Sequence, residues 1–284
     1  MNAIVSGGAD SLISLTGVSK RFPNGTLALD NVSLEVPRGQ LLSLIGLSGS
    51  GKSTLMRHLN GLHKPTAGTV RVMGVQVSSA SNRQLRSVRR NVGFVFQQFG
   101  LVGRATCLEN VLSGALGRLK GPRYGVWSYP RDLRRQAFDH LERVGLAPQA
   151  YQRADTLSGG QMQRVAIART LMQQPQLLLA DEPVASLDPE SSAQVLELLL
   201  RVAMEEKMTV IVTLHQVELA LGWAHRIVGL RDGQVVLDRD ARGLSQDDVM
   251  EVYQRVDREN AVVAGVKPAA QPGAQTVQSQ RVQG

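Results

Sequence analysis

Apolar and polar residues alternate in two segments near the amino terminus, 11–19 and 32–36, and this alternation predicts strands with one buried face. Three later segments, 41–45, 176–180 and 208–214, are instead apolar at nearly every position. Such runs are typical of parallel strands that are covered on both faces. Further strands are expected at 69–73, at 92–96 and in a hairpin over 227–237 that turns at Asp232-Gly233.

Helical patterns fill most of the intervals between these strands. They are expected at 52–61, in a short helix capped by Ser81, and at 106–117, 130–144, 148–153, 159–173, 189–206 and 245–257. Strands and helices that alternate in this way predict an α/β fold with a mixed or parallel sheet core. The segment from about 99 to 157 lacks strand patterns, so we expect an α-helical subdomain inserted into the main domain.

The two ends of the chain differ from its centre. Residues 1–11 are small and polar and are expected to be disordered, whereas the main domain is expected to span 12–245. The segment 246–284 is expected to hold a short helix and then a disordered tail, because residues 260–284 are rich in Ala, Gln, Val, Gly and Pro.

Composition indicates the redox compartment of the chain and its relation to a membrane. The single cysteine, Cys107, excludes an internal disulfide framework and fits a reducing compartment. No apolar run approaches the roughly 20 residues that a membrane-spanning helix needs. The amino terminus also lacks the basic and apolar regions of a secretory signal. We therefore expect a cytosolic chain that meets a membrane only through a partner.

The net charge of +8 is concentrated in one region. Eleven basic and two acidic residues lie between Arg83 and Arg135, so this basic region carries +9 and the rest of the chain carries −1. Such a region can face nucleic acid, anionic lipid or an acidic partner, or it can be a solvated surface with no partner.

The strongest chemical signal follows the apolar run 41–45. The residues there have the spacing G-x-x-x-x-G-K-[ST] of a phosphate-binding loop, and a helical pattern comes next. A Gly/Ser turn can precede a lysine by chance, but the flanking strand and helix favour nucleotide binding. Lys52 is expected to reach the β- and γ-phosphates and Ser53 to hold Mg²⁺. The loop consists of Gly46, Leu47, Ser48, Gly49, Ser50, Gly51, Lys52, Ser53 and Thr54.

Two carboxylates end the apolar strand over 177–180. Asp181 is expected to orient Mg²⁺ opposite Ser53, and Glu182 to polarise a water for in-line attack on the γ-phosphate. Two acidic residues at a strand end are common in surface loops. Their position roughly 130 residues after a phosphate loop, at the carboxyl edge of a parallel sheet, makes the catalytic interpretation much stronger.

A second helix start, Leu157-Ser158-Gly159-Gly160-Gln161, combines a hydroxyl with glycine N–H groups and a helix dipole. Taken alone it is an ordinary helix N-cap. Together with the first loop it gives two phosphate-binding helix starts about 110 residues apart, on different lobes. Both can serve one nucleotide only if two chains meet head to tail, as in a two-fold dimer that holds two ATP molecules.

The complete motif set resembles that of an ATP-binding cassette (ABC) ATPase over residues 12–240. It comprises the loop 46–54, Gln97, 157–161, Asp181-Glu182, Ser186-Leu187-Asp188 and His215. The resemblance implies a P-loop NTPase fold with ATP and Mg²⁺ as cofactors. It also implies that Phe22 stacks on adenine and that Gln97 contacts Mg²⁺ or the lytic water and senses a permease.

Further roles come from the same resemblance. Ser158 and Gly160, with Gly159 and Gln161 in the same motif, are implied to hold the γ-phosphate of the opposite chain. Asp188 is implied to cross the dimer joint. His215 is implied to contact the γ-phosphate and hold Glu182 in place, although a lone histidine after a strand is otherwise usually structural.

Finer features resemble the phosphonate-import ATPase subunits. They are the segments 111–118, 181–191 and 214–217, including Gln216 where many relatives have aspartate. This resemblance implies a homodimer on the cytoplasmic face of the inner membrane, bound to separate permease subunits and served indirectly by a solute-binding protein. It implies no nucleic acid, and the basic region is then expected on the membrane-facing side. The transported phosphonate or related phosphorus oxyanion would never touch this chain.

Two alternatives stay open at this point. One is an importer ATPase for another small solute, such as a polar amino acid or methionine, although a methionine-type subunit usually carries a folded carboxyl-terminal domain. The other is a soluble cassette ATPase acting on nucleic acid or ribosomes, which the basic region suggests. The chain has one motif set and no sustained heptads, so the sequence disfavours it.

Overall fold

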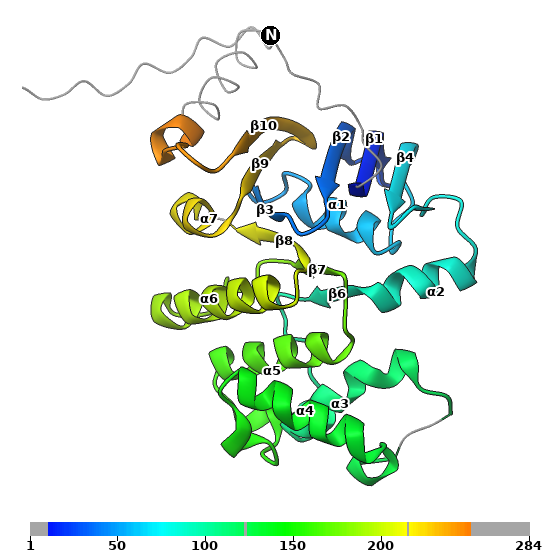
Figure 1. Ribbon diagram of the computed structural model, residues 1–284. Helices are drawn as coiled ribbons and strands as arrows, with labels where there is room; N and C mark the ends of the chain where they lie inside the picture. The colour runs from blue at the N-terminus through cyan, green and yellow to red at the C-terminus, as the bar shows by residue number, and fades with distance from the viewer. Residues whose placement is uncertain (1–10, 122–123, 215, 251–284) are drawn as a thin grey trace, which may run out of the picture.

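The computed structural model describes residues 11–121, 124–214 and 216–250, which contain two sheets (Figure 1). The smaller sheet is antiparallel, with strand order β2-β1-β4-β5. Its strands are β1 (Ser11–Arg21), β2 (Leu27–Pro37), β4 (Ala67–Val72) and β5 (Val75–Gln76). The alternating patterns thus extend into longer strands than predicted, and β1 already begins at Ser11, which we expected to be disordered.

The larger sheet has six strands in the order β10-β9-β3-β8-β7-β6. They are β3 (Leu41–Ile45), β6 (Val92–Val95), β7 (Leu177–Ala180), β8 (Thr209–Leu214), β9 (Arg226–Arg231) and β10 (Gln234–Asp240). All pairs are parallel except the hairpin of β9 and β10. Every residue of β3, β7 and β8 is buried, as their continuous apolar runs predict, and the expected α/β class is confirmed.

Alternate side chains of these strands enter two different hydrophobic clusters. Leu42 and Leu44 join the cluster formed with the smaller sheet and helix α1 (Lys52–Leu59). Leu41 and Ile45 join the cluster formed with α5 (Gly159–Met172) and α6 (Pro189–Glu205). The six-stranded sheet therefore separates two layers, with α1 and α5 on opposite faces (Figure 1).

The remaining helices mostly follow the predicted patterns. Helix α2 (Asn82–Asn91) begins in a capping box formed by Ser81 and Gln84, which confirms the expected cap. A short helix that the sequence did not predict, α7 (Val217–Trp223), follows β8. The expected helix over 245–257 is described only at its start, where residues 246–250 are helical; the rest lies outside the described residues, as do 1–10.

Between β6 and α5 the described chain is helical apart from loops and one isolated bridge. This helical segment contains α3 (Cys107–Ser113), α4 (Arg131–Arg143) and four short 3₁₀ turns. These are η1 (Gly114–Arg118), η2 (Val126–Ser128), η3 (Ala147–Gln149) and η4 (Ala154–Thr156). Helix α5 packs against both α3 and α4. None of the described helices has the length and apolarity that crossing a bilayer requires.

Two helix predictions in this segment need correction. The pattern over 106–117 is an α-helix only as far as Ser113 and continues as the 3₁₀ turn η1; Gly114 lies against α5, where a Cβ would be 2.1 Å from the Arg169 carbonyl oxygen. The predicted helix over 148–153 is wrong. The carbonyls of Ala150 and Gln152 instead accept the first N–H groups of α3, so they are not available to continue a helix.

Candidate functional site

The phosphate loop joins β3 to α1 and is shaped by three glycines with positive φ, namely Gly46, Gly49 and Gly51. At two of them any side chain is also sterically excluded. A Cβ on Gly46 would lie 2.3 Å from the Leu230 carbonyl oxygen, and one on Gly51 would lie 2.5 Å from that of Ala28. The loop is therefore wedged between β9 and the start of β2, and only glycine fits at both positions.

Lys52 folds back across this loop. Its Nζ donates to the carbonyl oxygens of Gly46 at 2.8 Å and Leu47 at 3.0 Å, and the residue is only 4% exposed. Burial lowers the pKa of the amine, while the charges of Glu182 and Asp181 oppose that shift. The lysine thus places a positive charge at the loop, beside two carboxylates, in the position expected for a triphosphate contact.

A hydrogen-bonded chain links the loop to the carboxyl edge of the sheet. Ser53 Oγ donates to Asp181 Oδ1 at 3.0 Å, and Thr213 Oγ1 donates to the same oxygen at 3.0 Å. Thr213 Oγ1 in turn accepts the backbone N–H of Glu182 at 2.7 Å. The structure therefore brings together Ser53, Asp181 and Glu182, as the sequence predicts, through a threonine that the sequence reasoning missed.

The backbone of Glu182 adopts a φ of 49°, a conformation that non-glycine residues rarely take. Such a residue persists only where its surroundings hold it, and the bond to Thr213 is one such restraint. Its side chain is half-buried and follows directly on the strand end. The restrained backbone therefore fixes the position from which the Glu182 side chain extends, at the edge of the sheet.

The Ser53 and Asp181 oxygens fit a magnesium ion. Two adjacent ligands of an octahedral Mg²⁺ with bonds of about 2.0–2.1 Å lie about 3 Å apart. The measured separation of 3.0 Å matches that spacing. Among the described residues no group of three His, Cys, Asp or Glu side chains could hold a metal.

Gln97 and Phe22 are two further predicted site residues, and both are at least partly exposed. Gln97 is exposed and comes two residues after β6, whose Val95 pairs with Ala180 directly before Asp181. Phe22 is the first residue after β1 and is half-buried, with the His63 ring 5.6 Å away in an edge arrangement and the Lys20 amine 5.4 Å from its centroid. Their contacts with nucleotide or metal stay predictions.

The second helix start forms a capping box. Ser158 Oγ accepts the N–H of Gln161 at 3.3 Å, and the Gln161 side chain accepts the N–H of Ser158 at 3.0 Å. Gly159 faces the loop before α6, where a Cβ would lie 3.2 Å from Leu187, and Gly160 faces the first turn of α6, where a Cβ would lie 3.2 Å from Ser191 Oγ. Since α5 and α1 lie on opposite faces of the sheet, one chain keeps its two phosphate-binding starts in separate layers.

Asp188 caps helix α6 within its own chain. Its Oδ1 accepts the N–H of Ser191 at 2.9 Å, and hydrogen bonds from Ser191 hold the pKa of the carboxyl below its usual value. The predicted contact across a dimer joint is not tested by a single chain. His215, the remaining predicted site residue, lies outside the described residues.

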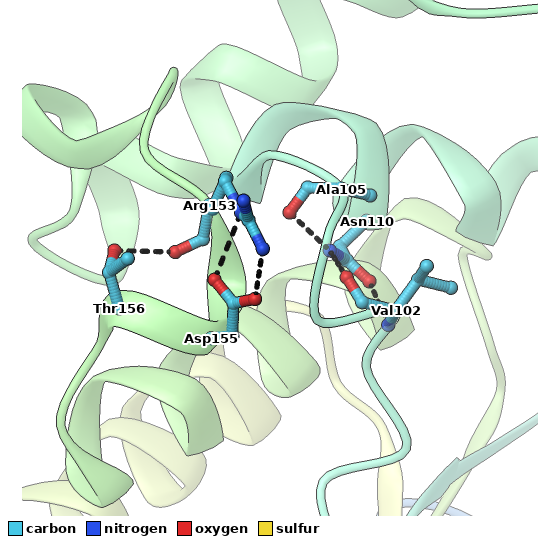
Figure 2. Close-up of polar contacts among 6 residues, drawn as sticks. All are labelled: Val102, Ala105, Asn110, Arg153, Asp155 and Thr156. Carbon is cyan, nitrogen blue, oxygen red and sulfur yellow. Dashed lines mark hydrogen bonds and ion pairs between the residues drawn. The ribbon is translucent and has the colours of Figure 1, made fainter.

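The segment after Gln97 is anchored by residues that the motifs did not indicate. The Asn110 amide accepts the N–H of Val102 and donates to the carbonyls of Val102 and Ala105, while Arg153 pairs with Asp155 beside it (Figure 2). Asn110 is 2% exposed, so these bonds are buried. A buried asparagine inside an otherwise apolar helical pattern was the available signal in the sequence.

Arg169 of α5 holds the same segment closer to Gln97. Its guanidinium donates to the carbonyl oxygens of Phe99 and Gly100, and burial lowers its pKa. Asn110 and Arg169 thereby connect the residues that follow Gln97 to the helical segment. A movement of either part would displace the other.

The fold and the ordered site define the class of protein. The ABC transporter family matches residues 29–185, more than half of the chain, and the chain belongs to that family. It is accordingly an ATPase that binds ATP, and the resemblance identified from the motifs is confirmed. A curated relative, the phosphate-import ATP-binding protein PhnC of Mycolicibacterium smegmatis, is 66% identical over 250 residues, which cover 88% of this chain and 95% of the relative.

Other relatives carry a related name. The phosphonates import ATP-binding protein PhnC of Nocardia farcinica is 58% identical, over 92% of this chain and 97% of the relative. Among solved structures, a dimer of the ATP-binding cassette MJ0796 in a post-hydrolysis state, bound to ADP and Pi, is 35% identical with a TM-score of 0.72. It covers 82% of this chain and 100% of the solved one.

Proposed function

We propose that this chain hydrolyses ATP to drive the import of a phosphorus oxyanion, phosphonate or phosphate, through a separate permease. The names of the relatives support this substrate class. The 66% identical relative is named for phosphate, whereas the relatives at 58% and 59% identity are named for phosphonates. Both substrates are small tetrahedral phosphorus oxyanions, so the shared chemistry is the proposal and the choice between them is an outcome of its test.

The observation that carries the ATPase mechanism is the hydrogen-bonded chain of Ser53, Asp181, Thr213 and Glu182. In the proposal Lys52 and the loop N–H groups bind the phosphates, and Ser53 with Asp181 holds Mg²⁺. When bound, the ion neutralises phosphate charge as the bond to the leaving group breaks. Glu182 accepts the proton of the attacking water, and its rigid backbone aims the carboxylate at the γ-phosphate side of the loop.

Neighbouring groups complete the proposed site. Gln97 reaches the ion or the water from the end of β6, His215 orients Glu182, and Phe22 stacks on the adenine. These three roles come from the motif resemblance, and the role of Gln97 is also supported by the pairing of Val95 with Ala180, directly before Asp181.

The second half of the site is proposed to come from another copy of the chain. Ser158 Oγ uses an acceptor position for its own helix cap, which leaves its O–H hydrogen able to donate to a phosphate. Gly159 and Gly160 supply N–H groups at the same helix start. Two chains related by a two-fold axis would each present Ser158 to the other's loop, and the dimeric neighbour MJ0796 supports this assembly.

The permease is proposed to dock beside the segment that follows Gln97. A cavity of about 480 Å³ opens there between α2, β6, η1 and α5. Four arginines line it, Arg86, Arg89, Arg90 and Arg169, and the described lining residues include no carboxylate. Such a cavity fits an acidic or carboxyl-bearing segment of the permease at the cytoplasmic face of the membrane. Arg86, Arg89 and Arg90 belong to the basic region.

Arg86 and Arg90 are suitable for testing this contact. Arg89 donates to the carbonyls of Asn60 and Gly61, and Arg169 supports Phe99 and Gly100, so altering either would also disturb the fold. Arg86→Glu with Arg90→Glu is expected to abolish transport while the isolated subunit keeps its basal ATPase rate. Full transport by that double variant would exclude the arginine-lined cavity as the docking site.

The substrate proposal is tested by deleting the gene and measuring uptake of radiolabelled phosphate, methylphosphonate and methionine. Loss of phosphate or methylphosphonate uptake, restored by the wild-type gene and not by Glu182→Gln, is expected. Loss of methionine uptake alone would identify the importer of another solute. Normal uptake of all three, together with ATPase activity that RNA or ribosomes stimulate, would favour the nucleic-acid alternative.

A further inference from the structure

The start of α4 carries an exposed surface of aromatic and basic side chains. Trp127 of η2 is 86% exposed and the nearby Tyr124 is 82% exposed. The Arg134 guanidinium lies 5.1 Å from the centroid of the Trp127 ring, which joins η2 to the helix. We call Tyr124, Trp127, Arg131, Arg134, Arg135 and Phe138 the aromatic–basic patch.

The basic members of the patch share one face of α4. Arg131, Arg134, Arg135 and Phe138 are spaced at i, i+3, i+4 and i+7, and Phe138 is itself 38% exposed. Ala137 and Leu141 are fully buried on the other face. Arg131 and Arg135 are exposed and Arg134 is half-buried beside Trp127, so the patch lies mainly in solvent, next to the buried side of α4.

These arginines do not stabilise their own helix. Basic residues near a helix amino terminus oppose the positive end of the helix dipole, and Asp132 is the acidic residue of the first turn of α4. The helix dipole therefore gives these guanidinium groups no stabilisation, and their positive charge is available to an anion outside the helix. The stacking of Arg134 on Trp127 keeps one of those groups beside an apolar ring.

The loop that carries the aromatic side chains has a defined turn. Ser128 Oγ donates to the Gly125 carbonyl oxygen at 2.8 Å and accepts the N–H of Tyr124 at 2.9 Å. Gly125 adopts a φ of 69°, which a glycine accommodates without strain. The two exposed rings are thus held on a formed turn that projects from the surface.

We propose that the aromatic–basic patch binds the anionic headgroup surface of a phospholipid bilayer. Tryptophan and tyrosine place an apolar ring and a polar tip at such a boundary, and arginine pairs with lipid phosphates. The described cavities of about 480 and 380 Å³ are not lined by patch residues. The exposed rings and guanidinium groups suit the deformable headgroup layer of a bilayer, which needs no preformed pocket.

This inference goes beyond the proposed transport function, because it assigns part of the basic region a lipid contact of its own. The binding would hold the helical segment against the membrane whether or not a permease occupies the arginine-lined cavity. Its failure would leave the transported substrate and the ATPase centre unaffected.

The two tryptophans of the chain make a direct test possible. Trp223 is buried and donates to the Leu196 carbonyl oxygen, so its emission should not respond to lipid. The full-length protein is mixed with phosphatidylcholine vesicles that contain either no phosphatidylglycerol or 30% of it (about a third of the lipid, a moderately anionic surface). We expect binding and a blue shift of Trp127 emission with the anionic vesicles only, both weakened by added salt. Trp127→Phe should bind with no blue shift.

The charge requirement is tested with matched reversals. Arg131→Glu with Arg135→Glu should weaken binding at least about 25-fold, from about fivefold per basic residue near an anionic surface. Arg239→Glu with Arg242→Glu makes the same change in net charge at exposed positions outside the patch and should bind nearly as wild type. Circular dichroism and ATP binding report whether each variant is folded.

Three results would overturn the proposal. They are absence of binding to anionic vesicles by the wild-type chain, equal loss of binding in the control double variant, and an unchanged Trp127 spectrum on bound protein. A photo-crosslinker at position 127 adds a test in the assembled transporter. Crosslinks to lipid support the inference, and crosslinks to the permease polypeptide alone contradict it.

Discussion

The Ser53 hydroxyl donates a 3.0 Å hydrogen bond to Oδ1 of Asp181, which lies 128 residues later in the chain. The first residue after Lys52 and the first residue after β7 thus meet at one point, beside the loop that is wedged by Gly46 and Gly51. Two oxygens at this spacing match one edge of an octahedral magnesium site, so in the proposed function the contact would join phosphate binding to metal binding.

Asp181→Asn keeps the shape of the side chain but removes the charge that Mg²⁺ would need. We expect the affinity for ATP in Mg²⁺ to fall at least about tenfold, towards the value in EDTA, because a charged contact of about 1.5–3 kcal/mol is lost. Titration of a fluorescent ATP analogue in both buffers measures it. Ser53→Thr, which retains a hydroxyl, is the control. A wild-type Mg²⁺ response in Asp181→Asn would contradict the assigned metal site.

Thr213→Val should impair turnover although Thr213 need not touch the nucleotide. The substitution leaves the Glu182 N–H without its acceptor and Asp181 without one donor, at a cost of about 1–3 kcal/mol for buried groups. We expect a lower kcat with little change in ATP affinity, and a lower unfolding midpoint. Thr213→Ser preserves the hydroxyl and should recover most of the rate. Equal rates for Thr213→Val and wild type would show that the threonine does not position Glu182.

Much of the fold could be predicted because fully buried strands and strands with one buried face have different hydrophobic patterns. The buried strands β3, β7 and β8 have continuous apolar sequences, whereas β1 and β2 alternate. Helix ends were harder to place, since they depend on distant partners. Helix α3 changes to a 3₁₀ turn at Gly114, which lies against the Arg169 backbone, and no local pattern around Gly114 indicates that close approach.

The residues of the candidate site also divide into those that the sequence indicates and those that it does not. Ser53, Asp181 and Glu182 belong to short motifs whose residue types indicate phosphate and metal chemistry, and the structure brings these residues close together. Thr213 and Asn110 have no such motif, because a threonine in a strand or an asparagine in a helix is ordinary until its partners are known. The roles of Gln97 and Ser158 depend on a permease and a second chain, so they stay predictions.

Glu182→Gln should separate nucleotide binding from hydrolysis. The amide keeps the size of the side chain but cannot accept the proton of the attacking water, so we expect turnover to fall by at least about 100-fold, the usual share of a general base. ATP should still bind and should accumulate in a two-chain complex. Size-exclusion chromatography with light scattering, run with ATP and with ADP, measures this state. Ser158→Ala in the same background removes a proposed cross-chain donor and should weaken the complex.

Near-normal hydrolysis by Glu182→Gln would remove this residue as the base. A complex that forms equally well with ADP, or without nucleotide, would show that the two chains associate by a surface other than the nucleotide joint. Either result would leave the Ser53–Asp181 contact in place, because that contact lies within one chain.

His58 should make folding stability sensitive to mild acid. Its Nδ1 lies 2.7 Å from the Thr54 carbonyl oxygen, its Nε2 is buried without a hydrogen-bond partner, and the residue is fully buried in α1. Burial lowers the pKa of this imidazole from its ordinary 6.5, the hydrogen bond with the Thr54 carbonyl opposes that shift, and the nearby His63 and Lys20 lower the pKa further. The unfolded chain therefore takes up a proton at a higher pH than the folded chain.

The sign follows from proton linkage. Stability is fully present above the unfolded pKa near 6.5 and is lost as the pH falls towards the lower folded pKa, by at most about 1.4 kcal/mol per pH unit for each such histidine. Urea unfolding at pH 7.5, 6.5 and 5.5 measures it. His58→Met removes the titrating ring, so its stability should fall less steeply below pH 6.5 than that of wild type. His140→Gln in α4 is the matched comparison, because burial also lowers the pKa of His140. The effects of His58→Met and His140→Gln on the pH dependence of stability should be additive. An identical pH dependence in His58→Met and wild type would show that His58 does not take up the proton on unfolding.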